Sequence, residues 1–404
     1  MKKTLLIGNP TFVLIMILTL VNACSNDKNP KNYLEKVLNS LEQIESATYY
    51  AKKEGWAPGD TSAFVIFYQY IKEYNNPFDS TIGASFVNLL QEDTTQMTFC
   101  YDGNMRALVY ENKQIIVIDS FNVRILPFRP LSPPFFNFTK NIIKYALETV
   151  DSISMDLEDF GDSVHFKLVI FEDKQVEFFG KPHYIDNPYN FGDKISKYEI
   201  WINKSNDLPY RVRREMSHDI AVITCKNIEL NKNKIDDFNA SDYFPSDYTT
   251  HLYRIRNKAT VKNDLVGKVA PNWVLNDADN NSFALEEFKS KVFMIEFTSV
   301  SCGPCLLSIS FLKQLASEYY KKDFDFVSIE SINRNSTVLK RYQDRNDFIY
   351  KFLISTKKVT KSYQIQAVPV FFILDENRVI RKIIRGYGKG TTDKEIRDAI
   401  NELI

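Results

Sequence analysis

The stretch "VSCGPCLL", residues 300–307, places two cysteines on either side of a Gly-Pro pair. Three interpretations are open for such a pair: a redox-active dithiol, half of a metal site, or two packing residues. Gly-Pro is poor packing material, and Pro304 suits the first turn of a helix. Cys302 would then lie at a helix N-terminus, where unpaired N–H groups and the helix dipole stabilise a thiolate. Cys305, one turn further on, could attack a mixed disulfide formed at Cys302.

A metal site at the cysteine pair is disfavoured by the number of available ligands. Zinc normally takes four ligands, and no second Cys-x-x-Cys or His pair accompanies this one. The four histidines occur singly and lie well before the pair, at His165, His183, His218 and His251. The residues therefore favour redox chemistry with no metal.

The segments around the cysteine pair alternate between apolar strands and helices. A strand is expected at residues 291–299, "KVFMIEFTS", just before the pair. The helix expected from residue 302 onwards carries an apolar stripe of Leu306, Ile309, Leu312 and Leu315. Further strands are expected at 324–331, 350–356, 368–376 and 379–387, and further helices at 335–347 and 392–404. Alternation of this kind builds an α/β sheet.

The N-terminal half of the chain has a different pattern. Residues 32–46, "NYLEKVLNSLEQIES", carry apolar side chains at helical spacing and predict an amphipathic helix. Short alternating strands follow from about residue 48 to about residue 232 and predict one antiparallel sheet or barrel. The Pro-rich stretch 127–138 is expected to be an ordered connection. A polar stretch from Ser246 to Asn263 is expected to link the two halves.

Residues 266–404 resemble the TlpA/ResA-like thiol-disulfide oxidoreductases of the thioredoxin superfamily, which also match the AhpC/TSA pattern. The resemblance rests on residues 266–305, "VGKVAPNWVLNDADNNSFALEEFKSKVFMIEFTSVSCGPC", and on residues 363–380, "YQIQAVPVFFILDENRVI". The stretch between Cys305 and Pro369 has room for the extra strand and helix that such proteins insert into the thioredoxin core. The resemblance implies an α/β thioredoxin fold, disulfide exchange with client proteins and no cofactor.

The same resemblance implies roles for four residues. Cys302 matches the attacking cysteine and Cys305 the resolving one, while Pro369 matches the cis-proline beside the dithiol. Glu296 matches the acid that thioredoxins bury beneath the disulfide. Its apolar neighbours favour burial, which would raise its pKa and let it take the proton from Cys305. The aromatic residues that usually precede the dithiol are replaced by "TSVS", residues 298–301, which leaves client preference open.

A peroxidase is the nearest alternative within the superfamily. Peroxiredoxins carry a Thr three residues before a single peroxidatic cysteine, with a Pro further upstream. Thr298 lies four residues before Cys302, and Met294 and Ile295 occupy the region where that Pro would lie. The sequence therefore disfavours peroxidase activity.

Residues from about 30 to about 250 resemble lipoprotein carriers of the LolA/LolB type. The resemblance rests on residues 101–119, "YDGNMRALVYENKQIIVID", on 198–212, "YEIWINKSNDLPYRV", and on 223–245, "ITCKNIELNKNKIDDFNASDYFP". It implies an unclosed antiparallel barrel wrapped on a helix around an apolar cavity. A fold likeness does not by itself give a function. Binding of a lipid or lipoprotein therefore stays a hypothesis, beside a barrel filled by its own side chains.

The N-terminus predicts export and a lipid anchor. Lys2 and Lys3 precede an apolar stretch, Thr11–Val21, that is shorter than the ~20 residues needed to span a bilayer. This stretch ends in "VNAC" at Cys24, which resembles the lipobox of bacterial lipoproteins, although Asn22 departs from the usual small residue. A cleaved signal with an incidental cysteine is the alternative. Both interpretations place the mature protein in an oxidising compartment.

Cys100 and Cys225 complete the cysteine inventory. Both lie within expected strands, in "MTFCYDG" and "VITCKNI". The sequence leaves open whether they form a disulfide across a sheet or serve as two separate packing residues.

Together these patterns predict a two-domain exported protein. We expect a lipoprotein signal at residues 1–23, a LolA-like β domain at 24–250, a linker at 251–265 and a thioredoxin domain at 266–404. The expected activity is reduction of client disulfides on the periplasmic side of a Gram-negative membrane, with a membrane reductant as electron donor. The alternative is a lipid- or lipoprotein-binding protein whose thioredoxin-like module serves for docking. The balance of 51 basic and 51 acidic residues argues against a nucleic-acid partner.

The lipid anchor gives a direct prediction. The Cys24→Ala variant should leave the membrane fraction or stay unprocessed, because the acylated residue is gone. Cell fractionation followed by mass spectrometry of the N-terminal peptide measures both outcomes. A wild-type protein that is soluble and carries no acyl chain would refute the anchor.

Overall fold

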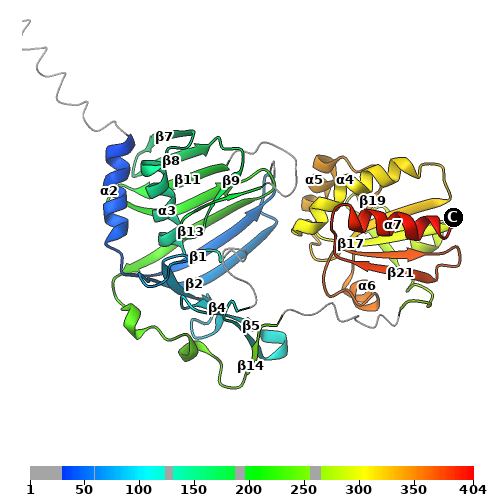
Figure 1. The fold of residues 1–404 in the computed structure, drawn as a ribbon, viewed down its shortest axis with the longest axis horizontal. Coiled ribbons are helices and arrows are strands. Elements are labelled where there is room, and N and C mark those ends of the chain that lie inside the picture. Colours follow the sequence, from blue (N-terminus) through cyan, green and yellow to red (C-terminus); the bar gives the residue numbers. More distant parts are fainter. Residues whose placement is uncertain (1–29, 59, 123–130, 187–195, 255–264) are drawn as a thin grey trace, which may run out of the picture. The chain divides into compact units, whose positions relative to one another are not determined.

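The computed structural model describes residues 30–58, 60–122, 131–186, 196–254 and 265–404 (Figure 1). Cys24 and the rest of the predicted signal lie outside the described residues, as does most of the predicted linker. Within the described ranges, no helix combines the length and the apolar character that crossing a membrane requires.

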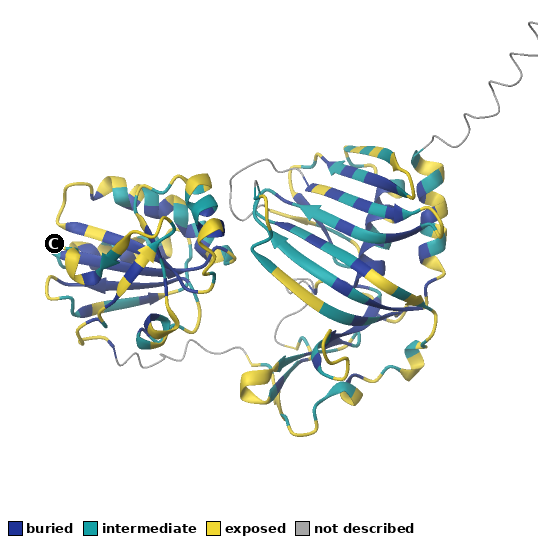
Figure 2. Cartoon of the chain, turned by 180° about the vertical axis from the view of Figure 1, so that it is seen from behind, coloured by how far each residue is buried: buried dark blue, intermediate teal, exposed yellow. Residues whose placement is uncertain are grey.

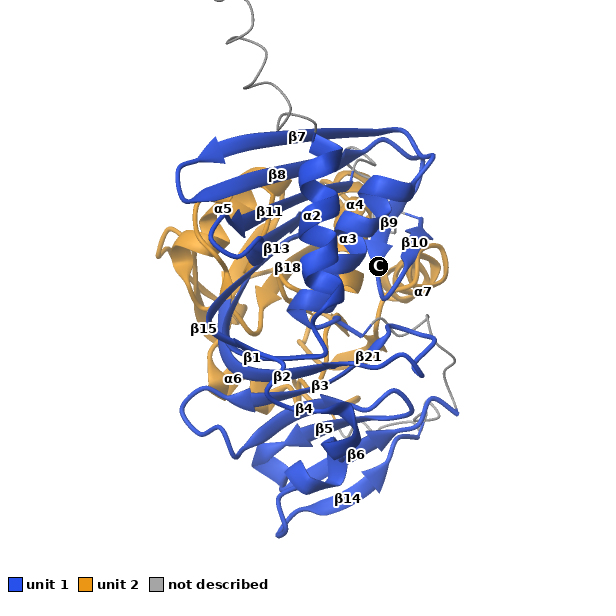
Figure 3. Ribbon diagram, turned by 90° about the vertical axis from the view of Figure 1, so that its left-hand side faces the viewer, with its two compact units in different colours: residues 1–54, 66–186, 193–254 blue, residues 55–65, 187–192, 255–404 orange. Residues whose placement is uncertain are grey.

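The chain divides into two compact units, which are coloured separately in Figure 3. Unit 1 comprises residues 1–54, 66–186 and 193–254. Unit 2 comprises residues 55–65, 187–192 and 255–404. Each unit contains its own large sheet.

Unit 1 contains a twelve-stranded sheet in the order β14-β6-β5-β4-β3-β2-β1-β13-β12-β11-β8-β7. Among the described strands, the two at the ends of this order do not pair with each other, so the predicted unclosed sheet is confirmed. The strands are β1 (Ser46–Trp56), β2 (Val65–Asn75), β3 (Ala84–Leu90), β4 (Met97–Tyr101), β5 (Arg106–Tyr110), β6 (Ile115–Asp119), β7 (Ile153–Phe160), β8 (Ser163–Ile170), β11 (Ser196–Asn203), β12 (Leu208–Glu215), β13 (Ile220–Leu230) and β14 (Thr249–Leu252). A separate pair consists of β9 (Gln175–Phe178) and β10 (Pro182–Ile185).

One strand of this sheet lies in the stretch from Ser246 to Asn263, which the sequence predicts as a polar link. There β14 pairs with β6 in parallel, with Thr249 opposite Ile115, so the prediction of an antiparallel sheet is wrong at this edge. Its side chains are exposed at every position, so the backbone pairing, and not an apolar pattern, makes it a strand.

Two helices pack against each other and against one face of the unit 1 sheet (Figure 3). The first, α2 (Pro30–Glu42), follows the predicted amphipathic pattern and buries Leu34, Val37 and Leu41. The second, α3 (Phe135–Glu148), begins inside the Pro-rich stretch 127–138. The prediction of a connection throughout that stretch is therefore wrong from Phe135 onwards.

Side chains from β1 and β2 fix the start of α3. The Tyr49 hydroxyl accepts the N–H of Phe135 at 2.9 Å and donates to the Glu73 carboxylate at 2.5 Å. That carboxylate also accepts the N–H groups of Phe136 and Asn137, at 3.1 Å each. The first N–H groups of a helix need partners from outside it, and negative charge is favourable there. Because these partners are distant in sequence, the local pattern does not reveal the helix.

Unit 2 contains a seven-stranded sheet in the order β16-β15-β19-β18-β17-β20-β21. Its strands are β15 (Val274–Asp277), β16 (Ser282–Ala284), β17 (Val292–Thr298), β18 (Phe324–Glu330), β19 (Lys351–Ile354), β20 (Val370–Leu374) and β21 (Ile380–Arg385). Its helices are α4 (Gly303–Glu318), α5 (Ser336–Asn346), α6 (Lys357–Ser362) and α7 (Thr391–Asn401). The three strands β17, β18 and β19 run parallel, and β20 runs antiparallel to β17. The predicted strand–helix alternation and α/β sheet are confirmed.

Side chains cover both faces of the unit 2 sheet. On one face, Met294 and Phe371 pack with Leu312 of α4 and Ile396 of α7. On the other face, Phe297 packs with residues around α6. All seven residues of β17 are buried, which Figure 2 shows as dark blue in the centre of the unit. This strand is therefore a rigid support for whatever follows it.

The apolar stripe predicted for α4 divides between two cores. Leu312 and Leu315 are buried under the sheet, together with Phe311. Leu306 and Ile309 are only partly buried and pack in a second cluster, next to residues of α5. A helix with apolar contacts on two sides has no single stripe.

Candidate active site

The candidate active site lies where β17 ends and α4 begins. β17 is held between β18, which is parallel to it, and β20, which is antiparallel. The chain leaves β17 after Thr298 and enters α4 at Gly303, so residues 299–302 form the connection. Ligands of α/β sheets commonly bind at the carboxyl ends of parallel strands, which is where this connection lies.

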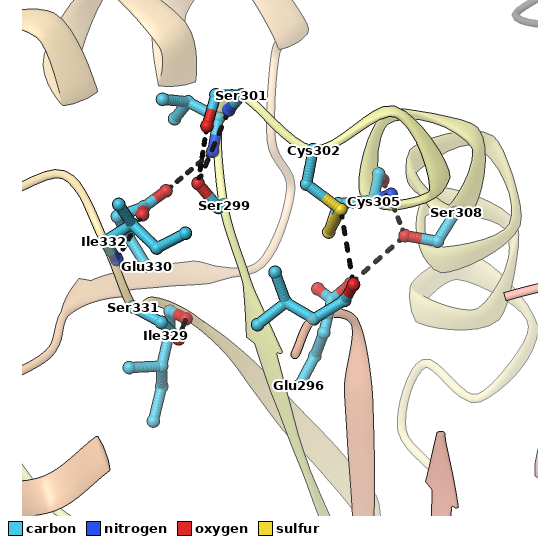
Figure 4. The surroundings of a disulfide bond; sticks show 12 residues. Glu296, Ser299, Ser301, Cys302, Cys305, Ser308, Ile329, Glu330, Ser331 and Ile332 are labelled. Atoms are coloured by element: carbon cyan, nitrogen blue, oxygen red, sulfur yellow. Dashed lines mark hydrogen bonds between the residues drawn. A yellow bond between two sulfur atoms is a disulfide. The ribbon is translucent and has the colours of Figure 1, made fainter. Parts of the chain in front are cut away.

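Cys302 and Cys305 form a disulfide at this point (Figure 4). Cys302 is the N-cap of α4, and its sulfur accepts the N–H of Cys305 at 3.2 Å. Pro304 occupies the first turn, as the sequence predicts. Cys302 is half-buried, whereas Cys305 is only 1% exposed. A reagent from solution can therefore reach the Cys302 sulfur more readily than the Cys305 sulfur.

Pro369 is brought next to the cysteine pair by the start of β20. The Val368–Pro369 peptide bond is cis, and the Val368 carbonyl oxygen lies 3.5 Å from the Cys302 sulfur. The Pro369 carbonyl accepts the N–H of Gly386, which ties this segment to the strand next to it. Pro369 is far from Cys302 in the sequence, and the pairing of β20 with β17 brings the two residues together.

Glu296 lies under the helix that carries the cysteines and is 1% exposed. The Ser308 hydroxyl lies 3.1 Å from its Oε1, and the Ser328 hydroxyl donates to its Oε2. The pKa of Glu296 is raised to about 7, mainly by burial. The hydrogen bonds from the two hydroxyls lower this pKa, and the charge of the nearby Glu330 raises it slightly. Ser308 also lies 2.7 Å from the Cys305 carbonyl, so one hydroxyl joins the acid to the second cysteine (Figure 4).

A second carboxylate near the site, that of Glu330, is missed by the sequence reasoning. Glu330 is fully buried at the end of β18, opposite Thr298 of β17. Its carboxylate accepts the N–H of Val300 at 2.7 Å, and also those of Ile332 and Asn333, at 2.7 and 2.8 Å. Glu296 is singled out by the family resemblance and by its apolar neighbours. The stretch "FDFVSIES" contains a second acid and two serines, so no such signal distinguishes Glu330.

The hydroxyls of Ser308 and Ser328 are also missed. They lie on α4 and β18, and the register that places Ser328 opposite Glu296 is a property of the folded sheet. No sequence signal distinguishes these two serines from the other serines of the chain.

Cys100 and Cys225 are both free and buried. They lie on β4 and β13 and belong to different hydrophobic clusters. Burial raises the pKa of the Cys100 thiol to about 12, which makes it a poor nucleophile. The structure therefore resolves the open question in favour of two packing residues.

A family model and several known proteins match part of this chain. Residues 265–400 match the Redoxin family. Thiol-disulfide oxidoreductase ResA of Bacillus cereus is 26% identical over 123 residues, which are 30% of this chain and 69% of the relative. Thioredoxin-like protein YneN of Bacillus subtilis is 26% identical over 118 residues, which are 29% of this chain and 69% of the relative. A crystal structure of a thioredoxin-family thiol:disulfide interchange protein from Chlorobium tepidum covers 35% of this chain and 98% of that chain, with 20% identity and a TM-score of 0.31.

The Redoxin match spans every residue of the site described above, from Glu296 to Pro369. The two curated relatives named above are a thiol-disulfide oxidoreductase and a thioredoxin-like protein. In its C-terminal part, this protein is therefore a thioredoxin-like thiol-disulfide oxidoreductase.

Proposed function

We propose that the protein is a lipid-anchored oxidoreductase on the periplasmic side of a Gram-negative membrane, where it reduces disulfides of client proteins through Cys302 and Cys305. The observation that carries this proposal is the cysteine pair at the N-terminus of α4, with one sulfur accessible and one buried. The N–H of Cys305 points at the Cys302 sulfur, which is the arrangement that stabilises a thiolate.

The proposed reaction has two exchange steps. The Cys302 thiolate attacks one sulfur of a client disulfide, a Cys302–client disulfide forms, and the other client sulfur leaves as a thiolate that takes a proton. Cys305 then attacks the Cys302 sulfur, so the disulfide within the enzyme forms and the client is released. Two electrons have passed to the client, and the enzyme is left in the oxidised state shown in Figure 4.

The oxidised pair must be reduced again before the next cycle. A pair with the sequence Cys-Gly-Pro-Cys suits a reductase, since thioredoxin has a reduction potential of about −270 mV. An oxidising compartment supplies no thiol pool of that strength. The proposal therefore includes a membrane reductant that delivers two electrons to the Cys302–Cys305 disulfide.

Glu296 is the proposed proton acceptor for Cys305. A buried thiol reacts poorly until it loses its proton, and a carboxylate with a pKa of about 7 can accept one near neutral pH. Ser308 supplies the connection, because its hydroxyl lies within hydrogen-bond distance of both Glu296 and the Cys305 backbone. Pro369 is proposed to flank the client chain, because the carbonyl before it lies beside the Cys302 sulfur.

A second candidate function rests on unit 1. A pocket of about 390 Å³ lies beside α3 and β9, with Phe138, Phe178 and Val212 in its mainly apolar lining. Arg214 lies at its wall and pairs with Glu177 and Asp219. A pocket that combines apolar and charged groups suits a lipid or a lipidated protein, and unit 2 would then serve for docking. Client binding without turnover would favour this function.

Trapping tests the proposed enzyme directly. In the Cys305→Ser variant the second step is blocked, so client proteins should accumulate covalently on Cys302 and be released by reductant. Non-reducing electrophoresis of periplasmic extracts measures the adducts. The matched control is Cys302→Ser, which should trap far less because Cys305 is buried. Equal trapping by both variants would overturn the assignment of the two roles, and no adduct in either would favour the binding function.

The pH dependence of the second step tests Glu296. A coloured thiol, thionitrobenzoate, can be attached to Cys302 as a mixed disulfide, and its release reports the attack by Cys305. In the wild type this rate should rise as pH passes about 7, because Glu296 accepts a proton only after losing its own. In Glu296→Gln the rate at pH 7.5 should fall about a hundredfold, which is the lower end of the usual contribution of a general base.

The control for that experiment is Glu287→Gln, which removes an exposed carboxylate of the same unit. It should leave the rate and its pH profile unchanged. A Glu296→Gln profile that overlays the wild-type profile would show that another group accepts the proton.

A further inference from the structure

We infer that Glu330 is a positioning residue of the dithiol: its buried carboxylate fixes the connection that presents Cys302 at the start of α4. Nothing in the exchange chemistry itself requires a second buried acid, so its presence needs a separate explanation. The inference rests on the proposed reaction at Cys302, because positioning matters only if that sulfur reacts.

The Glu330 carboxylate joins two loops that leave neighbouring strands. Its Oε2 accepts the N–H of Val300, which follows β17, at 2.7 Å. Its Oε1 accepts the N–H groups of Ile332 and Asn333, which follow β18, at 2.7 and 2.8 Å. The two strands are in register here, with Thr298 opposite Glu330. The Glu330 side chain therefore joins the two loops just beyond the ends of β17 and β18, where the backbone hydrogen bonds of the sheet end (Figure 4).

The connection from Val300 to Cys302 is short and folded on itself. The N–H of Cys302 donates to the Ser299 carbonyl at 3.1 Å, which closes a tight turn around Val300 and Ser301. The Ser299 hydroxyl lies 3.2 Å from the Ser301 hydroxyl, inside the same turn. Since the turn is compact, a shift at Val300 is transmitted to Cys302.

Burial of this carboxylate has a cost that apolar side chains at the same place would avoid. Glu330 is 0% exposed, and burial raises its pKa while the three N–H groups act in the opposite direction. A buried charge is tolerated only when its hydrogen bonds are made, and replacing such groups by apolar ones is often neutral for stability. The presence of a buried acid with three backbone N–H donors is therefore better explained by its contact with the loops than by a gain in the stability of the fold.

Positioning and charge have opposite consequences for Cys302. Removal of a nearby negative charge would by itself lower the pKa of the Cys302 thiol. Loss of positioning would raise that pKa, because the sulfur moves away from the Cys305 N–H and the end of α4. Because the Glu330 charge also raises the pKa of Glu296, the comparison is repeated in a Glu296→Gln background, where position 296 carries no charge. The sign of the change thus separates the two effects.

The test is the alkylation rate of Cys302 against pH, in the reduced full-length protein. Iodoacetamide reacts with thiolates, and mass spectrometry of the peptide assigns the product to Cys302 rather than Cys305. In Glu330→Gln we expect the pKa of Cys302 to rise by about one unit, which is the usual spread of side-chain pKa values among folded proteins. In Ser299→Ala we expect a smaller rise, because the turn keeps its main anchor.

The matched control is Asp375→Asn. Asp375 is a buried carboxylate of the same unit that also accepts backbone N–H groups, those of Asn377 and Val379 at 2.9 Å each, at the opposite end of β20. This variant should lose stability to urea without changing the pKa of Cys302. An unchanged or lowered pKa in Glu330→Gln would overturn the inference. Wild-type Cys302 with an ordinary thiol pKa would instead count against the proposed function, so the two failures are distinguishable.

Discussion

The register of β17 against its neighbours is the constraint on which the site depends. Successive residues of a strand point to opposite faces, so a slip of one residue would exchange every side chain between the two faces. In the observed register Met294 lies on the α4 face and Phe297 on the other, which leaves Glu296 facing Ser308 of α4. The strand ends at Thr298, and the short connection that follows it leads to Cys302. Apolar packing on both faces therefore places the Glu296 carboxylate beside Ser308, whose hydroxyl also contacts the Cys305 backbone.

Two buried acids, Glu296 and Glu330, have different surroundings, which is the basis for the different roles proposed for them. Glu296 has only two hydroxyl partners, so burial dominates and its pKa rises to about 7. Glu330 has three backbone N–H partners, which favour the charged form and oppose the effect of burial. A group that titrates near neutral pH suits proton transfer, whereas a group tied to three backbone atoms suits the fixing of a loop. The distinction comes from hydrogen-bond partners, because both acids lie on buried strands of one sheet.

Much of the fold and of the candidate site could be predicted from the local sequence. The other features depend on contacts between segments that are distant in the chain. The cysteine pair, Pro304 at the first helical turn and the apolar strand around Glu296 are local features, so the sequence reveals them. The start of α3 is different, because its N–H partners, Tyr49 and Glu73, lie more than sixty residues away. The binding of Glu330 to the turn before Cys302 likewise requires β17 and β18 to be paired. Sequence patterns show which residues are unusual, and the pairing of strands decides what they touch.

Catalysed reduction of a protein disulfide tests the central claim most directly. The full-length protein is mixed with insulin and dithiothreitol, and the precipitation of reduced insulin chains is followed by turbidity. The account predicts that wild-type protein accelerates precipitation well beyond the rate with dithiothreitol alone, and that Cys302→Ser returns the rate to that background. Equal rates with wild type and Cys302→Ser would contradict the claim that this sulfur carries out the exchange.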